Sequence, residues 1–168
     1  MAVIACTKKL FDLSNFQVLP IPEVGYRPLN SWHAHLFKVG RKNCVMIMND
    51  LTRYQVVLYG VRKEHFKNFD NLFLKNLEIA LRADQFTDQE INLFLSNMDK
   101  FIYTKTHNRS IVGSLNEQIF MTQHWIEKYL PTDELNIVGL NVKLNDSVIL
   151  KLAEGYPRLA LKNALLDM

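Results

Sequence analysis

Three short apolar segments, separated by turns of only a few residues, constrain the fold of this chain most strongly. They span Trp32–Val39, Cys44–Asn49 and Arg53–Tyr59. Their β-branched and aromatic residues favour strands. Gly40–Asn43 and Asn49–Thr52 are typical turn sequences. Connections this short join only antiparallel neighbours, so the three segments are predicted to form an antiparallel β-meander.

The apolar pattern changes to a helical period after Val61. Large apolar side chains recur there every three or four residues, at Phe66, Phe69, Phe73, Leu77 and Ala80. That spacing predicts one buried stripe of a long helix. Thr87–Glu90 and Ser114–Glu117 have the sequence of a capping box, which begins a helix. Helices are therefore predicted over residues 62–83, 88–98 and 114–129.

These elements predict an α+β fold in a single globular domain over residues 1–168. An antiparallel β-meander sheet would pack against several α-helices, with a single layer of helices on one face. Residues 2–7 are predicted to form a buried strand. Residues 101–106 form either a fourth strand of the meander or a loop edge. Residues 137–144 are predicted to form a last strand.

Charge and cysteine content limit the cellular compartment and the partners of the protein. The net charge is +3, and the sequence pI of 8.8 lies below the value of about 9 expected of a dedicated nucleic-acid domain. Cys6 and Cys44 both lie in predicted buried strands, and no Cys-x-x-Cys pair occurs. The apolar N-terminus is interrupted by Lys8 and Lys9 before it reaches the length of a secretory signal. We expect a cytoplasmic protein that does not enter a membrane.

Two histidines on one predicted strand are the first candidate site. His33 and His35 lie two residues apart, so their side chains share a face of the strand at a spacing of about 7 Å. Such a pair can approach one metal ion or phosphate. Two polar residues at a sheet edge, or hydrogen-bonded within the core, are the alternative. No third ligand stands at a usual zinc spacing, so no metal and no cofactor are predicted.

The polar segment before the third predicted helix is the second candidate. Arg109 offers a planar fork suited to phosphate or carboxylate, and a helix start adds free N–H groups. The candidate anion ligands here are His107, Asn108, Arg109, Ser110 and Ser114. A structural loop, in which these side chains bond nearby backbone, is the alternative. Asp50 joins the candidates if its turn folds over the histidines; otherwise it belongs to a plain turn.

Several of these segments together resemble a bacterial family of uncharacterised domains. The shared pieces are Cys6-Thr7-Lys8-Lys9-Leu10, Trp32-His33-Ala34-His35-Leu36, Asn49-Asp50 and Asn108-Arg109-Ser110-Ile111-Val112-Gly113-Ser114-Leu115-Asn116. The similarity covers about residues 3–160, with Ile111 and Leu115 as mild departures from the family pattern. It implies a small single-domain bacterial protein and supplies no activity.

Two classes of function remain open from the sequence. The first is a non-catalytic binding or regulatory module for an anionic ligand or a macromolecular partner, because no complete catalytic motif is present. Nucleic acid is one such partner, through a basic and aromatic surface made of Tyr54, Tyr59 and Tyr103 with Arg53, Arg62 and Lys63. Packing of these tyrosines within the sheet is the alternative. A homodimer is also possible. The second class is a phosphoester hydrolase or nuclease, with His33, His35 or His107 as acid or base and Arg109 stabilising negative charge.

Overall fold

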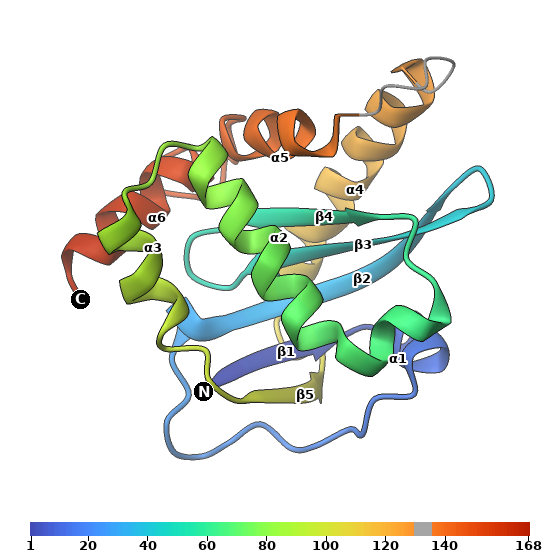
Figure 1. Cartoon of the computed structure of the whole chain (residues 1–168), viewed down its shortest axis with the longest axis horizontal. Coiled ribbons are helices and arrows are strands. Elements are labelled where there is room, and N and C mark those ends of the chain that lie inside the picture. Colours follow the sequence, from blue (N-terminus) through green and yellow to red (C-terminus); the bar gives the residue numbers. More distant parts are fainter. Residues whose placement is uncertain (130–135) are drawn as a thin grey trace.

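A five-stranded sheet forms the centre of the protein (Figure 1). The structure is a computed structural model that describes residues 1–129 and 136–168. The sheet order is β4-β3-β2-β1-β5. The strands span Ala2–Cys6 (β1), Ser31–Val39 (β2), Lys42–Asn49 (β3), Gln55–Tyr59 (β4) and Phe101–Lys105 (β5).

The sheet is mixed, so the prediction of a purely antiparallel meander is wrong. Strands β2, β3 and β4 do pair antiparallel, as their short turns require. Strand β1 pairs parallel with β2 on one side and with β5 on the other. The long connection from Thr7 to Asn30 gives the chain room for a parallel crossover, which a tight turn cannot provide. Residues 101–106 accordingly contribute an edge strand beside β1, and not a fourth meander strand.

Within the described residues, six helices and two short 3-10 segments surround the sheet. The helices span Lys8–Ser14 (α1), Phe69–Ala83 (α2), Asp88–Leu95 (α3), Arg109–Tyr129 (α4), Ile137–Asn145 (α5) and Pro157–Leu166 (α6). The 3-10 segments are Pro28–Asn30 (η1) and Lys63–Asn68 (η2). Residues 62–83 thus form η2 followed by α2. The Thr87–Glu90 capping box begins α3 as predicted, with Thr87 Oγ1 accepting the Glu90 N–H at 3.2 Å.

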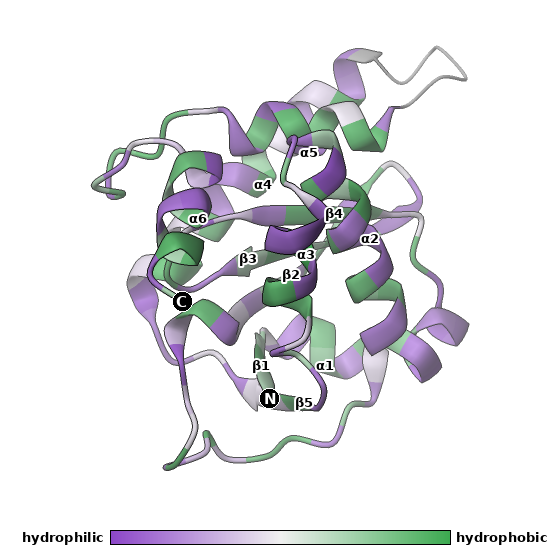
Figure 2. Cartoon of the chain, turned by 60° about the vertical axis from the view of Figure 1, so that its left-hand side comes forward, coloured by the Kyte–Doolittle hydropathy of each residue, from purple (hydrophilic) through white to green (hydrophobic). Residues whose placement is uncertain are grey.

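Helices cover both faces of the sheet, so the predicted single layer is also wrong. In Figure 1, α2 lies in front of the sheet and α4 behind it. Val45 and Ile47 belong to the core under α2, whereas Met46 and Met48 belong to the core under α4. A strand that is apolar on both sides needs cover on both sides. Figure 2 shows the helices alternating between hydrophobic and hydrophilic residues, as amphipathic helices do.

Residues 137–144 form a helix, and the prediction of a strand there is wrong. Helix α5 buries Leu140 and Leu144 one turn apart against the core under α4. Its asparagines also bond the free edge of β4. Asn141 Oδ1 accepts the Val57 N–H, and Asn145 Oδ1 accepts the Gln55 N–H, each at 2.8 Å. The helix therefore satisfies backbone groups that a further strand would otherwise pair.

The predicted core residues and cysteines are buried. Phe66, Phe69, Phe73 and Phe94 lie in the core under α2, and Cys6 and Cys44 are buried free thiols. The proposed basic and aromatic surface does not form around Tyr54 and Tyr103. Tyr54 is fully buried and donates to Asp84, and the half-buried Tyr103 donates to Asp70. Among the described helices, none combines the length and apolarity needed to cross a membrane.

Asp84 gives a pH-dependent test of this core. Its Oδ2 accepts from Tyr54 Oη at 2.5 Å, and Oδ1 is buried without a hydrogen-bond partner in the described residues. Burial raises the pKa of Asp84 from 3.8 to about 6, against the opposing effect of the Tyr54 hydrogen bond. The folded state therefore holds this proton more tightly than the unfolded state, so the contribution is stabilising at low pH. It is lost as the pH rises from about 4 to about 6.

We predict that Asp84→Asn becomes progressively more stable relative to the wild type across that window. The amide stays neutral and still accepts from Tyr54. Position 84 therefore adds no pH dependence to the stability of the variant. Urea unfolding of both proteins at about pH 4 and about pH 7 measures the difference. A difference in unfolding free energy that is the same at both pH values would contradict the prediction.

Candidate functional site

The candidate residues gather where β1 and β5 end. These strands are parallel neighbours, and the chain leaves them toward opposite faces. Leu10 of α1 packs in the core under α2, whereas Ile111 and Leu115 of α4 pack in the core on the other face. When connections diverge in this way, a crevice forms at the carboxyl ends of the strands, which is the usual ligand position in open α/β sheets. Thr7 and Thr106 follow the two strand ends.

His33 is the most deeply buried of the candidate residues in this region. It lies on β2, on the face covered by α4, and its side chain is 0% exposed. Its Nδ1 lies 2.7 Å from Asp50 Oδ1, and its Nε2 lies 3.5 Å from the backbone N of His107. Because an amide N–H donates only, Nε2 must accept there, and the ring proton resides on Nδ1. His33 therefore donates to Asp50.

Asp50 is buried because the turn after β3 folds inward. Asn49 Oδ1 accepts the N–H groups of Leu51 and Thr52, and its Nδ2 donates to Leu29 O at 2.8 Å. The Asp50 N–H donates to Ser31 O at 2.8 Å. The carboxylate is consequently only 3% exposed. Its second oxygen, Oδ2, accepts from Tyr26 Oη at 3.1 Å.

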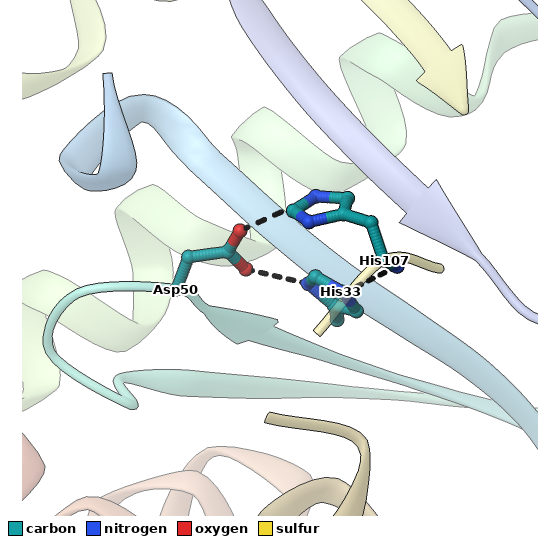
Figure 3. A group of neighbouring side chains, drawn as sticks. All are labelled: His33, Asp50 and His107. Carbon is teal, nitrogen blue, oxygen red and sulfur yellow. Dashed lines mark hydrogen bonds and ion pairs between the residues drawn. The ribbon is translucent and has the colours of Figure 1, made fainter. Parts of the chain in front are cut away.

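His107 completes the cluster from the loop between β5 and α4. Its Nε2 lies 4.0 Å from Asp50 Oδ2, and its side chain is 24% exposed (Figure 3). Its ring lies 4.7 Å from that of His33 and meets the ring of Tyr26 edge-on at 5.9 Å. Burial lowers the pKa of His107, and His33 lowers it further while Asp50 opposes both. The ring is therefore neutral at physiological pH and free to accept a proton or a cation.

His35 has a different partner from His33. Its Nδ1 lies 2.6 Å from Thr7 Oγ1, at the end of β1. Burial lowers the pKa of His35, and the positive charge of Lys9 lowers it further. No contact within the described chain joins His35 to Asp50 or His107. The two histidines share a face, as predicted, but only His33 belongs to the cluster with Asp50.

The polar segment begins α4 five residues earlier than predicted. The helix starts at Arg109, and Asn108 Oδ1 caps it by accepting the N–H groups of Ser110 at 3.0 Å and Ile111 at 3.2 Å. The prediction that a capping box at Ser114–Glu117 begins the helix is therefore wrong. Ser114 lies inside the helix, buried, and its Oγ has no hydrogen-bond partner among the described residues. A stronger cap upstream overrides the second signal.

An open hollow of about 490 Å³ adjoins His107 at the start of α4. Its lining consists of Thr106, His107, Asn108, Arg109, Val112, Gly113 and Asn116. Arg109 is exposed and forms no hydrogen bond or ion pair within the described residues. Lys151 Nζ lies 4.0 Å from the position that a Cβ on Gly113 would occupy, so a second cation stands beside the hollow. No carboxylate belongs to the lining.

The family relationship is decided by a match over most of the chain. The family model described as "Domain of unknown function (DUF6933)" matches residues 3–159. The chain belongs to the DUF6933 family. No curated protein and no solved structure matches it. Membership therefore confirms the resemblance to a family of uncharacterised domains and assigns no chemistry.

The DUF6933 structure brings some predicted residues together and separates others. His33, Asp50 and His107 form one cluster, and Arg109 lines the hollow beside it. Asn108 caps a helix, Ser114 is buried, and His35 pairs with Thr7. Ser110 is exposed in the first turn of α4.

Three further residues were missed by sequence reasoning. Tyr26 lies in the irregular segment before β2, and Lys9 and Lys151 carry no local motif. The fold brings Tyr26 and Lys151 to the site from distant positions, whereas Lys9 lies near His35. The Cys6–Leu10 segment of the resemblance contained Lys9, which is the one signal that pointed to it.

The two capping candidates give opposite predictions for stability. Asn108→Ala removes the side chain that satisfies two N–H groups, and we expect it to cost about 1 kcal/mol of unfolding free energy. Ser114→Ala removes a buried hydroxyl with no partner, and we expect it to be neutral or stabilising. Urea unfolding of both variants measures the difference. A larger loss for Ser114→Ala than for Asn108→Ala would contradict this assignment of the helix start.

Proposed function

We propose that this DUF6933 domain is a binding module for an anionic, phosphate-bearing ligand, held in the hollow at the start of α4. The observation that carries the proposal is the pair of unneutralised cations at that hollow. Arg109 and the neighbouring Lys151 form no ion pair within the described residues. A divergence of chain connections at the ends of β1 and β5 is also a usual position for a ligand.

The charge arrangement favours a phosphate over a neutral ligand. Arginine presents parallel N–H donors that match two phosphate oxygens, and a lysine ammonium adds a point charge. The N-terminus of a long helix, here α4, adds a favourable dipole. Asn108 already occupies the N–H groups of Ser110 and Ile111, so the side chains would provide most of the donors. The Asp50 carboxylate beside His107 is buried and does not line the hollow.

The setting proposed from the sequence is the bacterial cytoplasm. The buried free thiols of Cys6 and Cys44 support a reducing compartment. The bacterial part of this proposal rests on the resemblance described above. A protein or nucleic-acid partner would meet the same hollow through its own phosphate or carboxylate groups.

We predict that inorganic phosphate and pyrophosphate bind to the protein and that Arg109 dominates the affinity. Removing a charge-assisted hydrogen bond costs about 1.5–3 kcal/mol, so Arg109→Ala is expected to weaken binding at least about tenfold. Lys151→Ala should weaken binding less, because its ammonium stands at the rim. Isothermal titration calorimetry with each anion provides the measurement.

Lys75→Ala is the matched control, because Lys75 is an exposed lysine of α2 on the opposite side of the sheet. It removes the same charge without touching the hollow, so its affinity should equal that of the wild type. Equal losses in Lys75→Ala and Arg109→Ala would indicate nonspecific attraction and overturn the proposal. Absence of heat with either anion would overturn it as well.

A phosphoester hydrolase is the second candidate, and the pairing of Asp50 with His107 favours it. A buried carboxylate beside Nε2 would orient the imidazole, and Nδ1 would then serve as the acid or base. His33 is fully buried and His35 bonds Thr7, so neither fits that role as well as His107.

We expect His107→Ala to lower the hydrolysis of bis(p-nitrophenyl) phosphate by about 10²–10⁴-fold if this activity exists. The variant should bind phosphate nearly as well as the wild type, because Arg109 and Lys151 remain. Product release followed by absorbance provides the measurement. Turnover that persists in His107→Ala, or its absence from the wild type, would reject the hydrolase and leave the binding module.

A further inference from the structure

His33, Asp50 and His107 bring three metal-ligating groups to one point from three separate segments. Their nearest ligand atoms all lie within 4.8 Å of one another. Figure 3 shows the Asp50 carboxylate facing the two imidazoles, with one oxygen toward each ring. The distances are 2.7 Å to His33 Nδ1 and 4.0 Å to His107 Nε2. Tyr26 adds a fourth polar side chain, with its Oη at 3.1 Å from Asp50 Oδ2.

The carboxylate at the centre of this cluster is buried, and its oxygens accept hydrogen bonds from His33 and Tyr26. No lysine or arginine side chain of the described residues contacts its oxygens. Arg53 is close, but it donates to the backbone oxygen of Asp50 and not to the carboxylate. The tautomer of His33 makes that ring a neutral donor. Burying a carboxylate is costly unless a cation or several hydrogen bonds compensate it. The cluster therefore brings two imidazoles and one buried carboxylate together, which is a donor set suited to a divalent metal ion.

We propose that His33, Asp50 and His107 bind one divalent transition-metal ion, for which Zn²⁺ is the best fit. Two imidazoles and one carboxylate, with a remaining position for water, are a common ligand set of zinc sites that keep an open position. The same donor set suits other divalent ions of this series, including Co²⁺. The inference is independent of the proposed anion site, because neither Arg109 nor Lys151 takes part in it.

The cluster needs only a small rearrangement to hold the ion. Zinc binds nitrogen and oxygen at about 2.0–2.1 Å, which places tetrahedral ligand atoms about 3.3 Å apart. One ligand atom from each residue already lies within 4.8 Å of the others, so the three groups must approach by at most about 1.5 Å. His33 would have to transfer its ring proton from Nδ1 to Nε2. The 3.5 Å contact from the His107 N–H to Nε2 is the longest hydrogen bond of the cluster, and it must open when that proton moves.

The ion would lie directly behind the hollow, because His107 contributes to both. Its charge would then add to those of Arg109 and Lys151 at the anion site. Tyr26 would either take the fourth position or hold a bound water through its hydroxyl. Its ring already packs edge-on against His107 and keeps that imidazole over Asp50.

Titration of the tag-free, chelator-treated protein with zinc chloride tests the proposal. We expect one ion per chain by calorimetry, and visible absorption bands of a nitrogen- and oxygen-ligated ion when Co²⁺ is used instead. His107→Ala and Asp50→Asn should each weaken zinc binding by at least about tenfold. Asp50→Asn retains the shape of the turn and an oxygen that accepts from His33. It should therefore fold even if a variant with a smaller residue at position 33 does not. Thermal unfolding confirms that each variant is folded.

His124→Ala is the matched control, since His124 is exposed on α4 away from the cluster. Its zinc affinity should equal that of the wild type. No binding in the wild type, or equal binding in folded Asp50→Asn, would overturn the metal site. Arg109→Ala should leave zinc affinity unchanged, and phosphate affinity is measured with chelator present, so failure of one proposal is distinguishable from failure of the other.

Discussion

The apolar character of both faces of the sheet is the constraint on which this structure depends. The strands β2 and β3 carry large apolar side chains on both faces, and each face needs its own layer of helices. That requirement sends α1 and α4 to opposite faces from neighbouring strands. The crevice at the ends of β1 and β5 is a consequence of this packing. The position of the candidate site thus follows from how the core is covered.

Local interactions made part of the fold predictable from the sequence. The antiparallel pairing of β2, β3 and β4 is decided by turns of a few residues, and the Phe66–Phe73 stripe is decided by the helical period. Parallel pairing of β1 with β5 joins segments almost a hundred residues apart, and no local pattern encodes it. Residues 137–144 show the same limit. Their apolar content suits a strand or a helix, and the asparagines that bond the β4 edge decide for the helix.

The site was predictable in its residue types and not in its connections. His33 and His35 do share a face, because strand alternation is local. Which of them meets Asp50 depends on the inward fold of the Asn49 turn, held by hydrogen bonds to Leu29 and Thr52. The Asn49–Thr52 sequence therefore predicted the turn of the backbone correctly, but it gave no indication that the Asp50 carboxylate is buried. Tyr26 reaches that carboxylate from a segment without regular structure, so no periodicity could identify it.

The cluster also explains why stability alone is an incomplete account of His33 and Asp50. A histidine that donates to a buried carboxylate is a satisfied pair, and on its own it needs no second imidazole. Yet His107 has its ring against His33 and its Nε2 toward the second carboxylate oxygen, while its side chain remains partly exposed. A purely structural pair would be more stable if sealed by apolar side chains, because a nearby partly hydrated histidine adds a desolvation cost. The His107 ring lies where the buried His33–Asp50 pair and the open hollow meet. That position suits a group that transmits charge, a proton or a bound ion, from the core of the domain to a ligand at its surface.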